Sequence, residues 1–363
     1  MRRGKSSLLL TLLLAVAATA SAASAPAVSI DDLIESNHWK QALQAVQSRI
    51  NSNPSDAQAH AWMSKIKESF GDLAASLAEA QKAVDLDARN PEFHGQLAEA
   101  CAMTADISHV LKSLVYVHCM KREVELALTI DPRNINTMLV EMMFSLKAPG
   151  IAGGDKARAR KISDDIRNIS PSWGYLAAAR LLQDMDNDPV KEDLLNRAVE
   201  ADPKFYRARM ALATFYAINA HQKRPEQAEK LAKGMIALDP SNEGGYEILA
   251  RVYAAGGHWA ELDEILEKAS KAVPEDAGPY YAAADALNDS GMETVRGERY
   301  LEKYLSQPPE GRQPGHAKAR WLLAKFYSRE GKTADAIREL QTAVHLDPSL
   351  EPAQKDLKRL LHS

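Results

Sequence analysis

The stretch 317–350, AKARWLLAKFYSREGKTADAIRELQTAVHLDPSL, contains the pattern that the rest of the chain repeats. Apolar residues recur at helical spacing in each half, which predicts two short amphipathic helices joined by a tight turn at Glu330-Gly331-Lys332. The alanines at this spacing let two helix backbones approach closely. Pro348 then ends the second helix, because proline cannot continue the backbone hydrogen-bond ladder. We therefore expect a chain built from helix pairs.

Residues that end helices recur along the chain at intervals mostly close to about 34 residues. In repeat arrays each unit contacts only its neighbours, so a length of 363 residues does not require several domains. About nine helix pairs are predicted, and an apolar segment at 350–362 is expected to cap the last one. The helix stops are Pro54, Ala88, Pro132, Pro171, Pro203, Pro240, Pro274, Pro308 and Pro348.

A helix pair of this length and spacing resembles the tetratricopeptide repeat, whose pattern is W-x2-L-G-x2-Y, then A-x3-F, then P. The last unit matches it at Leu323, Tyr327, Ala336 and Pro348, with Ala324 in place of the glycine. The resemblance implies an all-α, right-handed solenoid. The units are expected at residues 26–56, 57–90, 91–134, 135–171, 172–205, 206–242, 243–276, 277–313 and 317–349, followed by the capping helix at 350–362.

The first 25 residues differ in character from the repeats. Basic residues at the start precede an apolar run from Leu8 to Ala18, and small residues then follow at the spacing of a signal-peptide cleavage site. The apolar run is shorter than the roughly 20 residues that a membrane-spanning helix needs. We expect a cleaved signal peptide over residues 1–25, a mature chain that begins at Ala23 or Pro26, and a periplasmic or secreted protein.

A loop longer than an ordinary turn is predicted in the fourth unit, from Ala148 to Ala157. Its sequence PGIAGG breaks the helix, and Asp155 can cap the helix that follows. The segment is similar to a Pro-Gly-Ile-x-Gly-Gly segment of exported bacterial tetratricopeptide proteins. A glycine-rich loop before a helix can also bind an anion, but the phosphate-loop spacing that ends in Gly-Lys-Ser/Thr is absent. A structural connector is therefore the favoured interpretation.

Composition and motifs point away from several classes of function. The net charge is −4, and no basic excess indicates a nucleic-acid partner. The ten histidines are scattered, without the His-Glu-x-x-His pair that binds a metal. No Gly-x-Ser-x-Gly elbow for a nucleophile occurs either. We therefore expect no enzyme activity, no metal, no cofactor and no bound nucleic acid.

The two cysteines, Cys101 and Cys119, lie in the third unit, whose second helix is expected to be extended from about Ile107 to Ile130. Cys101 is expected about one turn from the end of its helix, and Cys119 more than three turns along the returning helix. At about 1.5 Å per residue this offset is roughly 10 Å or more, whereas a disulfide needs Cα atoms within roughly 7 Å. The cysteines are predicted to remain buried thiols, unless the long helix is broken.

The resemblance also implies which residues face a partner. In tetratricopeptide arrays the first helices of successive pairs line a concave groove, and certain positions of each unit point into it. The C-terminal end of that groove gathers cations around a tryptophan, and arginine and tryptophan are frequent interface anchors. An acidic partner is expected there, with solvated charges beside a partly buried tryptophan as the alternative. The positions hold Lys65, Arg180, Arg207, Met210, Arg251, Tyr281, Lys318, Trp321, Lys325 and Arg329.

These features predict an exported scaffold or adaptor that binds a protein or an extended peptide in its concave groove, in cell-envelope assembly or secretion. One alternative is a small-ligand receptor or an enzyme framed by the solenoid, which would need convergent polar groups in a closed pocket. Another is a self-assembling structural array that associates through its end repeats. No membrane span is expected after signal cleavage, and neither the partner's identity nor the oligomeric state follows from the sequence.

Overall fold

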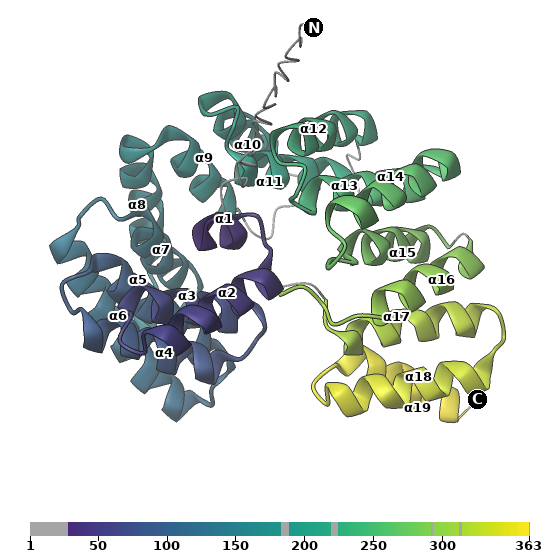
Figure 1. Ribbon diagram of the computed structural model, residues 1–363, viewed down its shortest axis with the longest axis horizontal. Helices are drawn as coiled ribbons and strands as arrows, with labels where there is room; N and C mark the ends of the chain where they lie inside the picture. The colour runs from purple at the N-terminus through teal and green to yellow at the C-terminus, as the bar shows by residue number, and fades with distance from the viewer. Residues whose placement is uncertain (1–27, 183–188, 219–223, 292, 312–313, 363) are drawn as a thin grey trace, which may run out of the picture.

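The computed structural model describes residues 28–182, 189–218, 224–291, 293–311 and 314–362. Within these ranges the chain forms nineteen α-helices and one short 3-10 helix, and no strand. Consecutive helices pack as pairs, and the pairs follow one another along an arc (Figure 1). This arrangement confirms the expected all-α solenoid of helix pairs. The expected signal peptide at 1–25 lies outside the described residues.

Nine helix pairs and a final single helix make up the described array. The 3-10 helix, Gly150–Ala152, lies between α7 and α8. The α-helices are α1 (Ile30–Glu35), α2 (Trp39–Ser52), α3 (Ala57–Ser69), α4 (Leu73–Leu86), α5 (Pro91–Ile107), α6 (Val110–Ile130), α7 (Ile135–Lys147), α8 (Lys156–Ile169), α9 (Pro171–Arg180), α10 (Pro189–Ala201), α11 (Tyr206–Ile218), α12 (Pro225–Leu238), α13 (Gly244–Gly256), α14 (Trp259–Ala272), α15 (Gly278–Ser290), α16 (Thr294–Leu305), α17 (His316–Arg329), α18 (Thr333–Leu346) and α19 (Glu351–Leu361).

Many junctions between repeats are built on the same local hydrogen bond. An aspartate at the end of the second helix accepts the backbone N–H two residues further on, as Asp239 does from Ser241 at 3.0 Å. An Asx turn of this kind competes with helical hydrogen bonding and so ends the helix. The aspartates that make this bond are Asp87, Asp131, Asp202, Asp239 and Asp347.

A second bond ties each of several first helices to the junction before it. A side chain in the first helix donates to the backbone carbonyl six residues earlier, as His60 Nε2 does to Pro54 at 3.0 Å. The other ring nitrogen of His60 lies 2.5 Å from Glu79 of α4. His60 is thus a buried histidine that holds a helix pair together rather than a ligand for a metal. Equivalent bonds to the junction carbonyl are made by His94, Arg209, Tyr246 and Gln354.

The core runs along the array without a break into domains through its C-terminal half. Leu176 and Phe326 belong to one continuous buried cluster, although they lie in different repeats. At the C-terminus, Ala353 of α19 is fully buried beside Leu340 of α18, and Leu357 packs against the same cluster. The last helix therefore covers the apolar face of the final pair, as expected for a capping helix.

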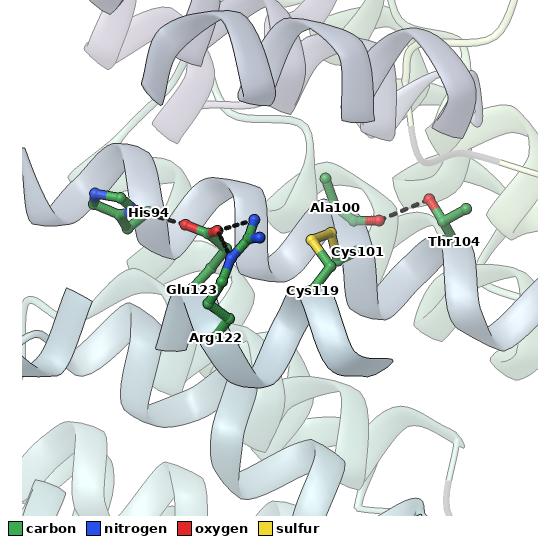
Figure 2. Close-up of a disulfide and its surroundings, with 7 residues drawn as sticks. All are labelled: His94, Ala100, Cys101, Thr104, Cys119, Arg122 and Glu123. Atoms are coloured by element: carbon green, nitrogen blue, oxygen red, sulfur yellow. Dashed lines mark hydrogen bonds and ion pairs between the residues drawn. A yellow bond between two sulfur atoms is a disulfide. The ribbon is translucent and has the colours of Figure 1, made fainter. Parts of the chain in front are cut away.

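The cysteines form a disulfide, so the prediction that they remain thiols is wrong (Figure 2). Their Cα atoms are 6.1 Å apart. The insertion in this repeat lengthens both helices: α5 continues for six residues past Cys101 to Ile107, and α6 begins at Val110, nine residues before Cys119. Because each residue adds about 1.5 Å, the offset along the axis is only about 4–5 Å. The prediction was wrong because it extended only the second helix of this repeat, whereas both helices are longer.

A buried ion pair lies on the same helix pair as the disulfide (Figure 2). His94 of α5 is 2.6 Å from Glu123 of α6, and Arg122 donates to the same carboxylate at 2.8 Å. His94 and Glu123 are both almost inaccessible to water. A buried carboxylate is tolerated when it is paired and hydrogen-bonded, so this contact and the disulfide together hold α5 against α6.

The loop between α7 and α8 is a connector. Asp155 caps α8, since its side chain accepts the backbone N–H groups of Ala157 and Arg158 at 2.9 and 3.0 Å. Lys121 of α6 reaches across and donates to the carbonyl of Ala152 at 3.1 Å. These contacts confirm the expected helix cap and attach the loop to the preceding repeat.

The arc turns far enough for its first repeat to reach the inner side of later ones (Figure 1). Ser36, in the turn between α1 and α2, donates to Asp239 at the end of α12 at 2.7 Å. His38 lies 2.9 Å from Glu275 in the turn between α14 and α15. The solenoid is therefore closed on itself by contacts between residues more than 200 positions apart.

Candidate functional site

The first helices of the pairs form the inner side of the arc. Successive first helices contact each other at most steps of the array, including α3 with α5, α11 with α13, and α13 with α15. In the described part of the chain, the second helices show no comparable contacts with the next second helix. Since helices on the inside of a curve are the more closely spaced, the inner surface is lined by first helices, as the resemblance implied.

The predicted residues in the middle of this surface are largely engaged with neighbouring repeats. Arg251 of α13 donates to Asp285 of α15 at 2.8 Å. Tyr281 is buried, its ring lies 5.3 Å from that of Tyr304, and burial raises the pKa of its hydroxyl. Arg207 lies over the ring of Trp173 at 5.5 Å, a cation–π contact. Arg251 and Arg207 thus join neighbouring repeats, whereas Tyr281 packs within its own helix pair.

Three further predicted residues lie elsewhere on the first helices. Lys65 is half-buried on α3, Arg180 is exposed at the end of α9, and Met210 is half-buried on α11. Met210 sits beside α13, because a Cβ added at Gly244 would be 3.2 Å from its sulfur. None of the three lines the hollow at the C-terminal end of the surface.

The C-terminal end of the inner surface contains a hollow of about 310 Å³ between α17, α18 and α19. Lys325 lies 4.9 Å from the ring centroid of Trp321. Arg329 donates to the carbonyl and the side-chain oxygen of Asn288 at 2.8 and 3.0 Å, which fixes the guanidinium at the rim. Lys318 is exposed one turn before Trp321. The residues that line the hollow are Ala324, Lys325, Ser328, Arg329, Leu340, Asp356 and Arg359.

The capping helix changes the role of the predicted tryptophan. The indole N–H of Trp321 donates to Asp356 of α19 at 2.9 Å, and the half-buried ring packs in the terminal cluster with Leu357. Asp356 also accepts from Arg359 at 2.9 Å. The tryptophan is therefore held by α19, while Arg359, which sequence analysis missed, adds a cation to the wall of the hollow. The lysines between the apolar positions of α19 could have indicated from sequence that the capping helix adds cations here.

A second part of the inner surface, which the sequence did not reveal, is acidic. Glu243 and Glu247 of the α13 region and Asp276 before α15 are close enough to influence one another. Burial and the charge of Asp276 raise the pKa of Glu247 to about 8, although Arg251 opposes this shift. Burial, with the charges of Glu247 and Asp276, raises the pKa of Glu243 well above its usual range. We refer to Glu243, Glu247 and Asp276 as the acidic centre.

Two structural features are absent from the residues that the structure describes. No group of three or more His, Cys, Asp or Glu side chains there is arranged to hold a metal ion. Within the same ranges, no helix is both long and apolar enough to cross a membrane.

Comparison with known proteins supports the fold. No family model matches the chain. Two pentatricopeptide repeat-containing proteins of Arabidopsis thaliana are 25% identical over 109 residues and 30% identical over 80 residues, which is 27% and 22% of this chain. The chain covers only 15% and 9% of the length of these two relatives.

Solved structures match over most of the chain. Yeast Tom70 aligns with a TM-score of 0.53 and 12% identity, covering 91% of this chain and 79% of that one. This chain has a tetratricopeptide-type solenoid fold. Human IFIT1, solved as a dimer with PPP-AAAA, aligns with a TM-score of 0.51 and 16% identity, covering 89% of this chain and 78% of the IFIT1 chain.

Proposed function

We propose that this solenoid is an exported interaction scaffold, and that the hollow at its C-terminal end binds an acidic segment of another protein. The observation behind the proposal is the lining of that hollow: three cationic side chains, Lys325, Arg329 and Arg359, face a single carboxylate, Asp356. Asp356 is already bonded to Trp321 and Arg359, so it does not neutralise Lys325. An incoming carboxylate would complete the charge balance.

The geometry favours a short extended or helical segment as the ligand. A hollow of about 310 Å³ can take one or two side chains and is too small for a folded surface. Arginines held in place by neighbouring groups bind carboxylates with little loss of side-chain freedom, and Arg329 is fixed by Asn288 in this way. The curved array presents such a ligand with an extended surface on either side.

Binding can be tested with synthetic peptides that differ in acidic content and in a free or amidated carboxyl end. Lys325→Glu should weaken binding of the acidic peptides by more than tenfold, which is about 1.4 kcal/mol. The wild-type affinity should fall as salt is added, because the charges lie at the surface. Lys303→Glu on α16, an exposed lysine outside the hollow, is the matched control.

Thermal stability separates loss of binding from loss of fold. Among the described residues, Lys325 is in contact with the Trp321 ring and forms no ion pair, so Lys325→Glu should leave the unfolding temperature nearly unchanged. Equal peptide affinity in Lys325→Glu and wild type would contradict the assignment of the hollow as the binding site. Preference for basic peptides would reverse the proposed partner chemistry.

Export rests on separate observations. The order of basic, apolar and small residues in the first 25 positions is that of a signal peptide. The Cys101–Cys119 disulfide is of a kind that persists in oxidising compartments. An intact mass of protein purified from the cell envelope should correspond to a chain that starts at Ala23 or Pro26. A mass that retains residues 1–22 would contradict export with cleavage.

A further inference from the structure

The contact that closes the solenoid is made by one short segment, Ser36–Gln41, in the turn and first helical turn of the first repeat. This segment faces carboxylates from three different parts of the C-terminal half: the end of α12 with the start of α13, the turn before α15, and the loop after α16. The partners are 203 to 270 positions away in the sequence. No neighbour-to-neighbour contact of a repeat array explains such pairing.

Cations and amide donors of the segment meet acidic acceptors across the contact. His38 lies 2.9 Å from Glu275, and Gln41 donates to the same carboxylate at 2.5 Å. The ammonium of Lys40 donates to the Glu275 carbonyl at 2.7 Å and lies 3.1 Å from Glu310. The interaction is therefore polar and charge-complementary.

The backbone of the segment is shaped for this contact. Asn37 has a φ of +63°, a left-handed conformation that asparagine adopts more readily than other non-glycine residues. Its side-chain amide donates to Glu243, a member of the acidic centre, at 3.0 Å. The backbone N–H of Lys40 donates to Glu310 at 2.7 Å. That amide belongs to the first turn of α2, where a helix offers no internal acceptor, so it reports directly on this contact.

The two sides of the contact have separate cores. Leu33, Trp39 and Trp62 belong to a cluster within the first repeats. Most buried apolar residues of α13 to α17 belong to another cluster. Since each repeat is stabilised by its neighbours, the contact can break without unfolding any helix pair. The paired side chains are largely covered in the closed form, since Lys40 and Glu310 are 25% and 1% exposed and His38 and Glu275 are 12% and 18% exposed. Opening the contact returns these groups to water, which offsets part of the loss of their pairing.

We propose that Ser36–Gln41 is a reversible clasp that closes the solenoid beside its acidic centre, and that the open form binds cationic peptide segments at the carboxylates that the clasp covers, Glu243, Glu275 and Glu310. The occupant seen in the structure defines the chemistry of the ligand. A competing segment has to present a positive side chain and hydrogen-bonding groups to Glu243, Glu275 and Glu310, as Lys40, His38 and Asn37 do. This surface differs in charge and location from the cationic hollow at the C-terminal end.

The opening variant is His38→Glu/Lys40→Glu, which places carboxylates against Glu275 and Glu310. His38 and Lys40 make no other side-chain hydrogen bond or ion pair among the described residues, so local helix structure should survive. Small-angle scattering should show a larger maximum dimension than in wild type. Hydrogen exchange of the amide at position 40 should accelerate at least tenfold, with the circular dichroism unchanged.

Two further variants act as controls. Lys67→Glu/Lys82→Glu changes charge in α3 and α4 of the same half of the chain, away from the clasp, and should leave both readouts at wild-type values. Adding Glu275→Lys to the opening variant restores an opposite-charge pair and should return the scattering dimension toward that of wild type. Failure of this addition to re-close the molecule would overturn the pairing argument.

A variant that changes no charge tests closure independently. Gly311 has a φ of +53°, and a Cβ on it would lie 2.2 Å from the Trp39 ring. Gly311→Ala should therefore force the loop away from Trp39 and give the same faster exchange at position 40. Unchanged scattering and exchange in both Gly311→Ala and His38→Glu/Lys40→Glu would overturn the clasp, as would loss of helical structure in both.

The ligand is tested with a synthetic peptide that copies residues 36–52. It should bind the His38→Glu/Lys40→Glu chain at least tenfold more tightly than wild type, in which the chain's own segment occupies the surface. A peptide carrying both glutamate substitutions should not bind. Equal binding of the native peptide to wild type and variant, or to neither, would overturn the assignment of Glu243, Glu275 and Glu310 as a docking surface.

Discussion

Arg251 and Lys325 occupy the same position in two repeats, each between the small alanine and the tyrosine of its first helix. Arg251 is paired with Asp285, which lies 34 residues further along the chain. The residue 34 positions after Lys325 is Arg359, a second cation. One repeat step thus carries an ion pair between successive first helices, and the other carries two like charges on the wall of a hollow.

The difference shows how one repeat frame can produce two kinds of surface. In the middle of the array, opposite charges at the repeated position join α13 to α15, and the acidic centre beside them is covered by the first repeat. At the end of the array, two like charges occupy the matching positions, and a hollow lies between α17 and α19. The same repeat position therefore joins two helices in one place and lines a hollow in the other.

The largest expected effect comes from the disulfide, which is remote from both surfaces. Cys101→Ser/Cys119→Ser removes a cross-link between positions 18 residues apart and should destabilise the N-terminal repeats by about 3 kcal/mol. Because repeats are stabilised by their neighbours, acidic-peptide binding at the C-terminal hollow should be unaffected. Denaturant unfolding followed with peptide titration checks this. Loss of peptide binding in the folded variant would mean that the two ends are coupled.

The tight helix contacts at Ala250 and Ala324 should differ in how well they tolerate a larger side chain. Ala250 is fully buried within the long central cluster, and Ala324 is equally buried in the smaller terminal one. Replacing either with Leu overpacks the contact by roughly 1–3 kcal/mol. Ala250→Leu should lie near the upper end, since repeats flank it on both sides, while the single capping helix can shift for Ala324→Leu. Denaturant midpoints measure both, with Ala74→Leu on an exposed face of α4 as control.

The acidic centre should make stability depend on pH. Glu247 has a folded pKa of about 8, raised from 4.5, so folding is favoured when its carboxyl is protonated. That contribution is complete below the unfolded pKa near 4.5 and is lost as the pH rises through about 8. Glu247→Gln cannot ionise and should be more stable than wild type at pH 9. At pH 4 the two should unfold at similar denaturant concentrations; a constant difference at both pH values would contradict the ionisation argument.

The substitution with the smallest expected effect on stability gives the last repeat step the opposite charges that are found between α13 and α15. Arg359→Asp places a carboxylate opposite Lys325, as Asp285 stands opposite Arg251. An exposed ion pair of this kind adds only about 0.2–1 kcal/mol, which thermal unfolding should just detect. Acidic-peptide affinity should nevertheless fall by more than tenfold, because the hollow would lose the Arg359 cation and gain a second carboxylate beside Asp356. Unaltered affinity would show that Arg359 and Lys325 do not act together.

The repeat frame, the helix stops and the capping helix could be predicted from sequence because each depends on residues close together in the chain. Pro348, the alanines and the aspartates of the repeat junctions act through local backbone geometry and side-chain size. The same holds for Asp155, whose cap of α8 is made with the next two or three residues. The cationic side chains at the end of α17 were also identified in this way, although the part played by α19 was not.

Only the tertiary structure decided which of these residues are covered, paired or left open. The disulfide depends on how an insertion is divided between two helices, and a difference of a few residues moves Cys101 by several ångströms. The clasp and the acidic centre depend on small angles between repeats that accumulate until residue 38 meets residue 275. A local sequence pattern does not specify this accumulated curvature, because the curvature is set jointly by the packing at every repeat interface.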